Sequence, residues 1–178
     1  TVEEMSSYIN FADTKQYDGL CYGIPTTANF QGVLYNKAVL QAAGVTEIPR
    51  TPEAFIEALQ KIKDNTDAIP LYTNYAAGWT MGAWDFYAGA GATGDANFVN
   101  IDMISMKDPF AARSDNAGPY AVYKILYDAT QMGLIEDDYT TTDWESCKPM
   151  LNNGKIATMM LGSWAYVQMR DAVGGEHP

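Results

Sequence analysis

The stretch NGKIATMMLGSWA, residues 153–165, decides how the last third of the chain folds. Residues 156–161 between its glycines predict a strand, which follows a predicted helix that ends near residue 154. Ser163 is a residue type that caps helices, so the next segment predicts a last helix through about Val173. This reading puts Trp164 at the entrance of the helix, beside backbone N–H groups that have no partner within it.

Working outward from this stretch, the chain predicts a mixed α/β fold in which helices predominate. Extended segments are expected at residues 20–25, 33–35 and 69–72. Helices are expected at residues 2–10, 37–43, 52 onward, 79–90, 119–132 and 144–154. Glycines at positions 89, 91 and 94 should break the pattern after the fourth of these helices.

Two helices are predicted most clearly. Thr51 can cap the first, with Pro52 at its first position and Glu53 in its first turn. Its apolar face is formed by Phe55, Ile56, Leu59 and Ile62. Pro119 opens the second helix, which ends before Gly133 and whose apolar residues recur at helical spacing: Val122, Ile125, Leu126, Ala129 and Met132. Asp143 is expected to cap the following helix, which Pro149 could kink.

Composition limits the function classes. The chain has 178 residues, 47% of them hydrophobic, which is enough for one packed unit. A net charge of -11 repels phosphate backbones and anionic lipid surfaces, so nucleic acid is not expected as a partner. No apolar run approaches the roughly 20 residues that span a bilayer. Cys21 and Cys147 have no zinc or redox spacing; we expect buried free thiols, and a single disulfide stays open.

The residue types that usually carry catalysis or bind metals do not occur here in a pattern that favours an enzyme. His177 is the only histidine and lies next to the end of the chain, which excludes a histidine-based triad or metal site. The acidic run at residues 136–138 is expected to be a solvated loop, although an acid pair of the glycosidase kind stays open. The glycine-rich segment 89–94 lacks the Lys-Ser or Lys-Thr of a phosphate loop. We expect no cofactor and no metal.

The aromatic residues point to ligand binding. Pyranose rings pack C–H groups on Trp or Tyr faces and need directed hydrogen bonds to their hydroxyls. Trp164 is the strongest aromatic candidate. Trp79 is the second, because it ends a loop of small and polar residues after a predicted strand, and Asn74 and Tyr75 lie in that loop. Trp84 and Phe86 are expected to pack inside the protein.

Four motifs occur in a characteristic order along residues 20–166. They are Tyr-Gly-Ile-Pro at 22–25, Tyr-Asn-Lys at 35–37, Pro-Arg-Thr-Pro-Glu-Ala-Phe at 49–55, and Gly-Lys-Ile-Ala at 154–157 followed by Gly-Ser-Trp-Ala at 162–165. In this order they resemble the extracellular solute-binding proteins of carbohydrate ABC importers, including the maltodextrin-binding proteins. Thr158 before Met159 is a small departure from the family pattern.

The resemblance implies a fold, a site and partners. The fold is α/β, of the periplasmic-binding-protein type II, with two lobes that close on ligand. The implied site stacks sugar on Trp164, takes contacts from Asn74, Tyr75 and Trp79, and adds polar contacts from Asn29 and Gln31. Residues 35–37 are expected to be structural. The implied partners are a carbohydrate ligand and the membrane permease subunits of an importer. A monomer outside the cytoplasm is expected, with lipid anchoring open.

Such receptors are usually about twice this length. The chain is therefore expected to be one partial unit of a two-lobed protein, with residues 1–25 from the end of the first lobe and the crossover, and residues 26–178 mostly from the helix-rich carboxy-terminal lobe. Two alternatives stay open: a receptor of the same fold for a non-sugar solute, and a carbohydrate-active enzyme.

Overall fold

A computed structural model of the protein describes residues 3–4, 7–8, 16–18, 20–95 and 97–172. The chain divides into two compact units, Thr1–Phe30 and Gln31–Pro178. In the first unit, β1 (Gln16–Tyr17) and β2 (Leu20–Cys21) form a small antiparallel pair. Most of the helix predicted over residues 2–10 lies outside the described residues.

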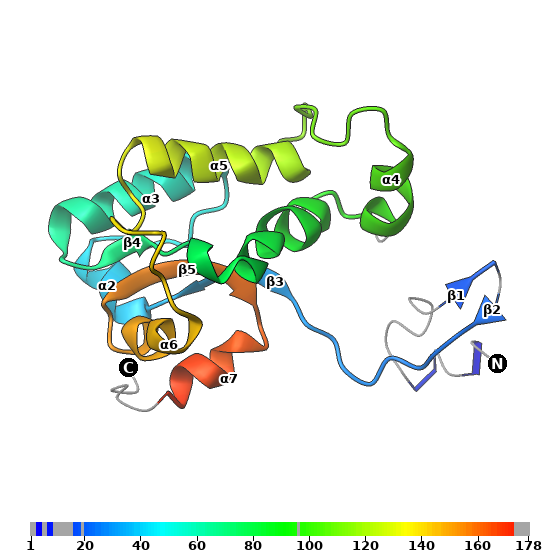
Figure 1. Cartoon of the computed structure of the whole chain (residues 1–178), viewed down its shortest axis with the longest axis horizontal. Helices are drawn as coiled ribbons and strands as arrows, with labels where there is room; N and C mark the ends of the chain where they lie inside the picture. The colour runs from blue at the N-terminus through cyan, green and yellow to red at the C-terminus, as the bar shows by residue number, and fades with distance from the viewer. Residues whose placement is uncertain (1–2, 5–6, 9–15, 19, 96, 173–178) are drawn as a thin grey trace. The chain divides into compact units, whose positions relative to one another are not determined.

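A three-stranded sheet forms the centre of the second unit (Figure 1). Its order is β3 (Gln31–Tyr35), β5 (Ile156–Gly162) and β4 (Ile69–Leu71). The central strand, β5, runs antiparallel to β3 and parallel to β4, and all of its residues are buried. Complete burial explains why its sequence is largely apolar instead of alternating. The three strands predicted here are confirmed, with β3 beginning two residues before the expected position 33.

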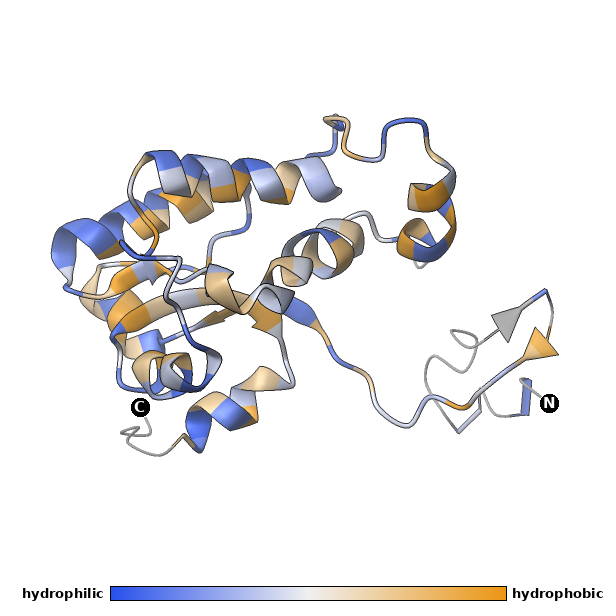
Figure 2. Ribbon diagram, in the orientation of Figure 1, coloured by the Kyte–Doolittle hydropathy of each residue, from blue (hydrophilic) through white to orange (hydrophobic). Residues whose placement is uncertain are grey.

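Helices cover both faces of this sheet (Figure 1). Those of the second unit are α2 (Lys37–Ala42), α3 (Pro52–Asn65), α4 (Met103–Ser105), α5 (Pro119–Gln131), α6 (Trp144–Asn152) and α7 (Ala165–Arg170). One core lies on the side of α3 and α5 and includes Leu59, Trp84 and Val122. The other lies on the side of α6 and α7 and includes Cys147 and Met169. Figure 2 shows hydrophobic residues along β5, which lies between these two helical layers.

Capping residues set the starts of three helices, two of them, Thr51 and Asp143, as the sequence predicts. The side chains of Asn36, Thr51 and Asp143 each accept a hydrogen bond from a backbone N–H in the first turn of α2, α3 and α6. Asn36 is buried and its amide also donates to the carbonyl oxygens of Leu151 and Asn152, at 2.9 and 3.1 Å. It therefore ties α2 to the end of α6, in agreement with its expected structural role.

The last helix begins later than predicted. Its first residue is Ala165 and its N-cap is Trp164, whose side chain makes no capping hydrogen bond. The prediction that Ser163 is the cap was therefore wrong by one residue. The helix ends at Arg170, short of the expected position 173, and Asp171 follows as its C-cap.

The expected helix over residues 79–90 was also wrong in kind. Short 3₁₀ turns form η2 (Tyr75–Ala77) and η3 (Trp79–Ala83), and a wider π-helical segment forms η4 (Trp84–Gly89). Gly78, at a positive φ of 72°, separates the first two because few other residues adopt that conformation. A second irregular helical segment, η5 (Phe98–Asp102), leads into α4 and was not predicted.

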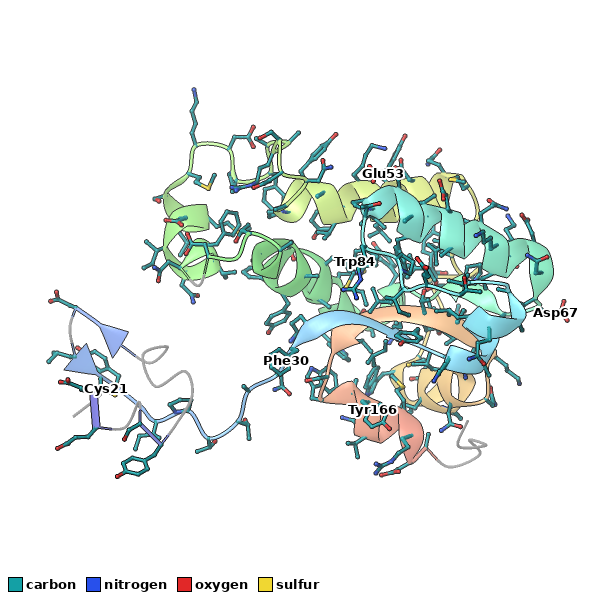
Figure 3. The ribbon with its side chains drawn as sticks, turned by 180° about the vertical axis from the view of Figure 1, so that it is seen from behind. Cys21, Phe30, Glu53, Asp67, Trp84 and Tyr166 are labelled. Carbon is teal, nitrogen blue, oxygen red and sulfur yellow. The ribbon has the colours of Figure 1, made fainter. Side chains whose placement is uncertain are left out.

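Burial confirms one further expectation and corrects two others. Trp84 is 1% exposed and lies between the helices and the sheet, as predicted (Figure 3). Phe86 does not pack inside, since 51% of its surface is exposed. Both cysteines are free, but only Cys147 is buried; Cys21 is exposed. Within the described residues, the helices are too short or too polar to cross a membrane.

Candidate binding site

Three tryptophans that are far apart in the sequence lie together in the second unit. The ring centroids of Trp79 and Trp144 are 4.9 Å apart, and both lie 5.7 Å from that of Trp164. These distances are typical of direct aromatic contact. We call these three residues the tryptophan cluster. The structure thus brings together the two tryptophans that the sequence singled out and adds a third.

Each member of the cluster lies at the start of a helical segment. Trp79 begins η3 directly after Gly78, Trp144 begins α6 directly after its cap Asp143, and Trp164 precedes α7. Trp79 is 49% exposed, and the other two rings are partly buried. The cluster therefore offers apolar ring surface to solvent while its inner rings hold it in place.

Gln31 reaches the same place from the neighbouring strand. It lies opposite Gly162 in the β3–β5 ladder. A Cβ atom on Gly162 would lie 2.5 Å from Cδ1 of Trp164 and 2.8 Å from Oε1 of Gln31. Because Gly162 lacks a side chain, the indole ring and the Gln31 amide both occupy the space above it. Two predicted site residues are thereby brought together, one aromatic and one polar.

A second aromatic pair flanks the loop before Trp79. The rings of Tyr75 and Tyr139 meet edge to face with centroids 5.6 Å apart. Both are partly open to solvent, with 52% and 42% of their surfaces exposed. Tyr75, like Trp79, follows β4 in the chain. Tyr139 lies between α5 and α6, five residues before Trp144, the first residue of α6.

Asn74 differs from the other predicted site residues. Its side chain is 0% exposed, and its backbone adopts the left-handed conformation with φ of 52°. Neither atom of its side-chain amide has a hydrogen-bond partner within the described structure. In this conformation the side-chain amide does not reach the surface. The backbone carbonyl oxygen of Asn74 accepts a hydrogen bond from the Thr80 hydroxyl at 2.8 Å.

Glu136 contradicts the expectation of a solvated acidic loop. It is 5% exposed, and its carboxylate accepts hydrogen bonds from the loop after β4. Asp137 and Asp138 beside it are exposed, as expected. Among the described residues, no group of three or more His, Cys, Asp or Glu side chains is arranged to hold a metal ion.

Asn29 lies in the first unit, Thr1–Phe30, and is exposed there. Its part in a site stays a prediction. The sequence reasoning missed Trp144, Tyr139 and Glu136. Trp144 had a signal that could have found it, since it follows a capping residue at a helix start as Trp164 was expected to do. Tyr139 and Glu136 had none, because only the tertiary fold carries them to the loop after β4.

Comparison with known proteins decides the family. The family described as bacterial extracellular solute-binding protein matches residues 4–176. The chain belongs to this family. This match confirms the resemblance to solute-binding proteins that the four motifs indicated.

Solved structures of sugar-binding proteins share its fold. A manno-oligosaccharide-specific solute-binding protein from Bifidobacterium animalis subsp. lactis, BlMnBP2, in complex with mannotriose, is 52% identical, with a TM-score of 0.85 over 99% of this chain and 41% of that one. BlMnBP1 of the same organism, a binding protein of an ABC transporter in complex with mannobiose, is 49% identical, with a TM-score of 0.86 over 99% of this chain and 42% of that one. This solute-binding protein thus has the type II periplasmic-binding-protein fold.

A more distant relative is the multiple sugar-binding protein of Streptococcus mutans serotype c. It is 24% identical over 163 residues, which are 88% of this chain and 36% of the relative. The chain therefore spans less than half the length of the relatives and solved structures that it matches.

Proposed function

We propose that this solute-binding protein is the receptor of an ABC importer and that it binds a saccharide on the tryptophan cluster without chemically altering it. The observation that carries the proposal is the placement of Trp79, Trp144 and Trp164 in mutual contact with Gln31 beside them. Aromatic faces suit the C–H patches of a pyranose, and an amide beside them suits its hydroxyls.

Manno-oligosaccharides are the substrate class we favour. The two solved structures at about half identity hold mannobiose or mannotriose. Identity at that level supports a related ligand, although each hydroxyl contact depends on individual side chains. Tyr75 and Trp79 supply one edge of the proposed surface, and Gln31 and Trp164 the other. Asn74 contributes through the backbone of its loop, and Asn29 remains a candidate polar contact.

We infer the remaining parts of the function from the family resemblance. The receptor acts outside the cytoplasm as a monomer and delivers its ligand to the permease subunits of the importer. The acidic charge of -11 favours neutral or cationic solutes over anionic ones, in agreement with a neutral sugar.

The test is a thermal-shift titration of the full-length protein with mannobiose, mannotriose, maltotriose, xylotriose and chitobiose. A ligand raises the melting temperature of the state that it binds, so the bound sugar identifies itself. Trp164→Ala is titrated in parallel, with Tyr127→Ala on the exposed surface of α5 as the matched aromatic control.

We expect mannotriose to raise the melting temperature of the parent and of Tyr127→Ala, and to have little effect on Trp164→Ala. No shift with any of the sugars would contradict a saccharide receptor. A shift of equal size in Trp164→Ala would contradict the assignment of the tryptophan cluster as the binding surface. Release of shortened sugars during the titration would contradict a binding role without chemistry.

A further inference from the structure

The buried carboxylate of Glu136 lies where two distant segments of the chain meet. Residue 135 forms an isolated parallel bridge with Leu71 in β4, and the backbone N–H of Leu71 donates to the carbonyl oxygen of Leu134 at 3.0 Å. The chain therefore runs beside β4 up to Glu136. At that point β4 has ended and the loop that leads to η2 begins.

Three donor groups of this loop make hydrogen bonds to the carboxylate of Glu136. The backbone N–H of Thr73 donates to Oε2 at 2.8 Å, the Thr73 hydroxyl to Oε1 at 2.6 Å, and the backbone N–H of Asn74 to Oε1 at 3.0 Å. The same hydroxyl accepts from the backbone N–H of Tyr75 at 3.2 Å. A single carboxylate thus fixes the path of three consecutive residues, which include the left-handed turn at Asn74.

No basic side chain of the described residues forms an ion pair with Glu136. A buried charge is costly unless hydrogen bonds satisfy it, and an apolar replacement is often no less stable. Fold stability alone therefore gives little reason for a carboxylate here. What a carboxylate provides, and an apolar side chain does not, is a defined set of acceptors for one loop conformation.

Each of the two segments that Glu136 joins carries two aromatic residues of the proposed binding surface. The loop after β4 carries Tyr75 and Trp79, and the segment after Glu136 carries Tyr139 and Trp144. Each aromatic pair has one member from each segment, with centroids 5.6 and 4.9 Å apart. A further bond, from the backbone N–H of Ala76 to the Thr142 hydroxyl at 3.0 Å, joins the same segments. The register between the segments therefore decides how the rings meet.

We propose that Glu136 is a positioning residue for saccharide binding: its carboxylate holds the Thr73–Asn74 backbone so that Tyr75 and Trp79 present their rings against Tyr139 and Trp144. The inference takes its saccharide ligand from the proposed function. The position of the loop is argued from the hydrogen bonds to Glu136. Glu136 acts through the loop and does not touch the sugar.

The test compares two buried threonines with matched hydrogen bonds. Thr73 and Thr158 are 5% and 3% exposed, and each hydroxyl donates at 2.6 Å, to Glu136 and to the carbonyl oxygen of Pro70 respectively. Thr73→Val removes a contact of Glu136, and Thr158→Val removes an equivalent bond within the sheet. Glu136→Gln keeps the size of the side chain but turns an N–H₂ group toward one of the donors.

Mannotriose affinity is measured by calorimetry at a temperature where every variant is fully folded. We expect Glu136→Gln and Thr73→Val to bind at least about tenfold more weakly than the parent, and Thr158→Val to stay within about twofold. Thr73→Ser, which keeps the hydroxyl, should restore the parent affinity. Equal affinity losses in Thr73→Val and Thr158→Val, or unchanged affinity in Glu136→Gln, would overturn the proposal.

A second readout separates this proposal from the proposed function. Amide hydrogen exchange at Asn74 and Tyr75, and the near-ultraviolet circular dichroism of the tryptophans, report the loop and the rings without any sugar. We expect Glu136→Gln to speed amide exchange at Asn74 and Tyr75 and to change the near-ultraviolet spectrum. Asp137→Asn, at an exposed position, is the control and should change neither. If the parent binds none of the sugars, the proposed function fails; unchanged exchange and an unchanged spectrum would overturn the role of Glu136 itself.

Discussion

The indole ring of Trp164 lies over Gly162, two residues earlier in the chain, in the space that a side chain would otherwise fill. A Cβ atom at Gly162 would be 2.5 Å from Cδ1 of the ring, closer than carbon atoms approach without a shift. The absence of a side chain at one residue therefore sets the position of the aromatic face at the other. Gln31 shares this space from the opposite strand.

Gly162→Ala should displace the Trp164 ring and the Gln31 amide together. We expect mannotriose affinity to fall by about tenfold or more, because overpacking moves rings that must meet the ligand. Calorimetry measures the affinity. Gly32→Ala is the matched control: it lies in the adjacent strand, and an added Cβ there meets no atom within 4 Å. Equal affinities of Gly162→Ala and the parent would show that the position of Trp164 does not matter for binding.

Trp144 should matter for binding although it was not among the predicted site residues. Trp144→Ala removes the ring that contacts both other members of the tryptophan cluster, and we expect affinity to fall by about tenfold. Trp144→Phe keeps an aromatic face and should lose less. The same calorimetric titration measures both. Full affinity in Trp144→Ala would restrict the surface to Trp79 and Trp164.

Asn36 should be a major determinant of stability. Its side chain caps α2 and donates to two carbonyl oxygens at the end of α6, all in a buried position. Asn36→Ala removes both of these buried hydrogen bonds as well as the cap of α2, so we expect a loss of about 2–4 kcal/mol in the free energy of unfolding. Urea denaturation measures it. Thr51→Ala removes an exposed cap alone and should cost only about 1 kcal/mol.

Stability should fall in alkaline solution. Burial raises the pKa of the Cys147 thiol to about 12, and burial together with nearby Cys147 and Glu136 raises that of the Tyr72 hydroxyl to about 12. Both groups stay protonated in the folded chain while the unfolded chain releases its protons, from about pH 8.5 for cysteine and 10 for tyrosine. Unfolding is therefore favoured increasingly from about pH 8.5 to 12, by up to about 1.4 kcal/mol per pH unit for each group.

Urea denaturation across that pH range tests the alkaline prediction. Cys147→Ala should flatten the loss that begins near pH 8.5, since a residue without a thiol cannot titrate. Cys21→Ala is the matched control, because Cys21 is exposed. A curve for Cys147→Ala parallel to that of the parent would contradict the role of the buried thiol.

The sequence by itself determined the regular elements and the family. Capping residues and apolar periodicity placed α3, α5 and α6 because these signals act within one or two turns of the chain. The central strand was evident because burial on both faces requires apolar residues along its length. Four ordered motifs pointed to the solute-binding family, which the comparisons confirmed.

Local signals failed where glycines and aromatic residues replaced regular periodicity. The segment from Tyr75 to Gly89 became 3₁₀ turns and a π-helical segment instead of one helix, because tertiary contacts outweigh weak helix preference there. Phe86, which was expected to pack inside, lies in this irregular segment and is exposed.

Only the tertiary structure decided which residues share the proposed site. Sequence reasoning could select Trp79 from its loop after a predicted strand and Trp164 from its place at a predicted helix start. It could not predict their contact with each other or with Trp144. Nor could it distinguish the buried Glu136 from its exposed neighbours, because burial of a carboxylate depends on donors more than 60 residues away in the chain. Secondary structure follows from interactions between near neighbours, whereas a binding surface is assembled from segments that meet only when the sheet and its helices have packed.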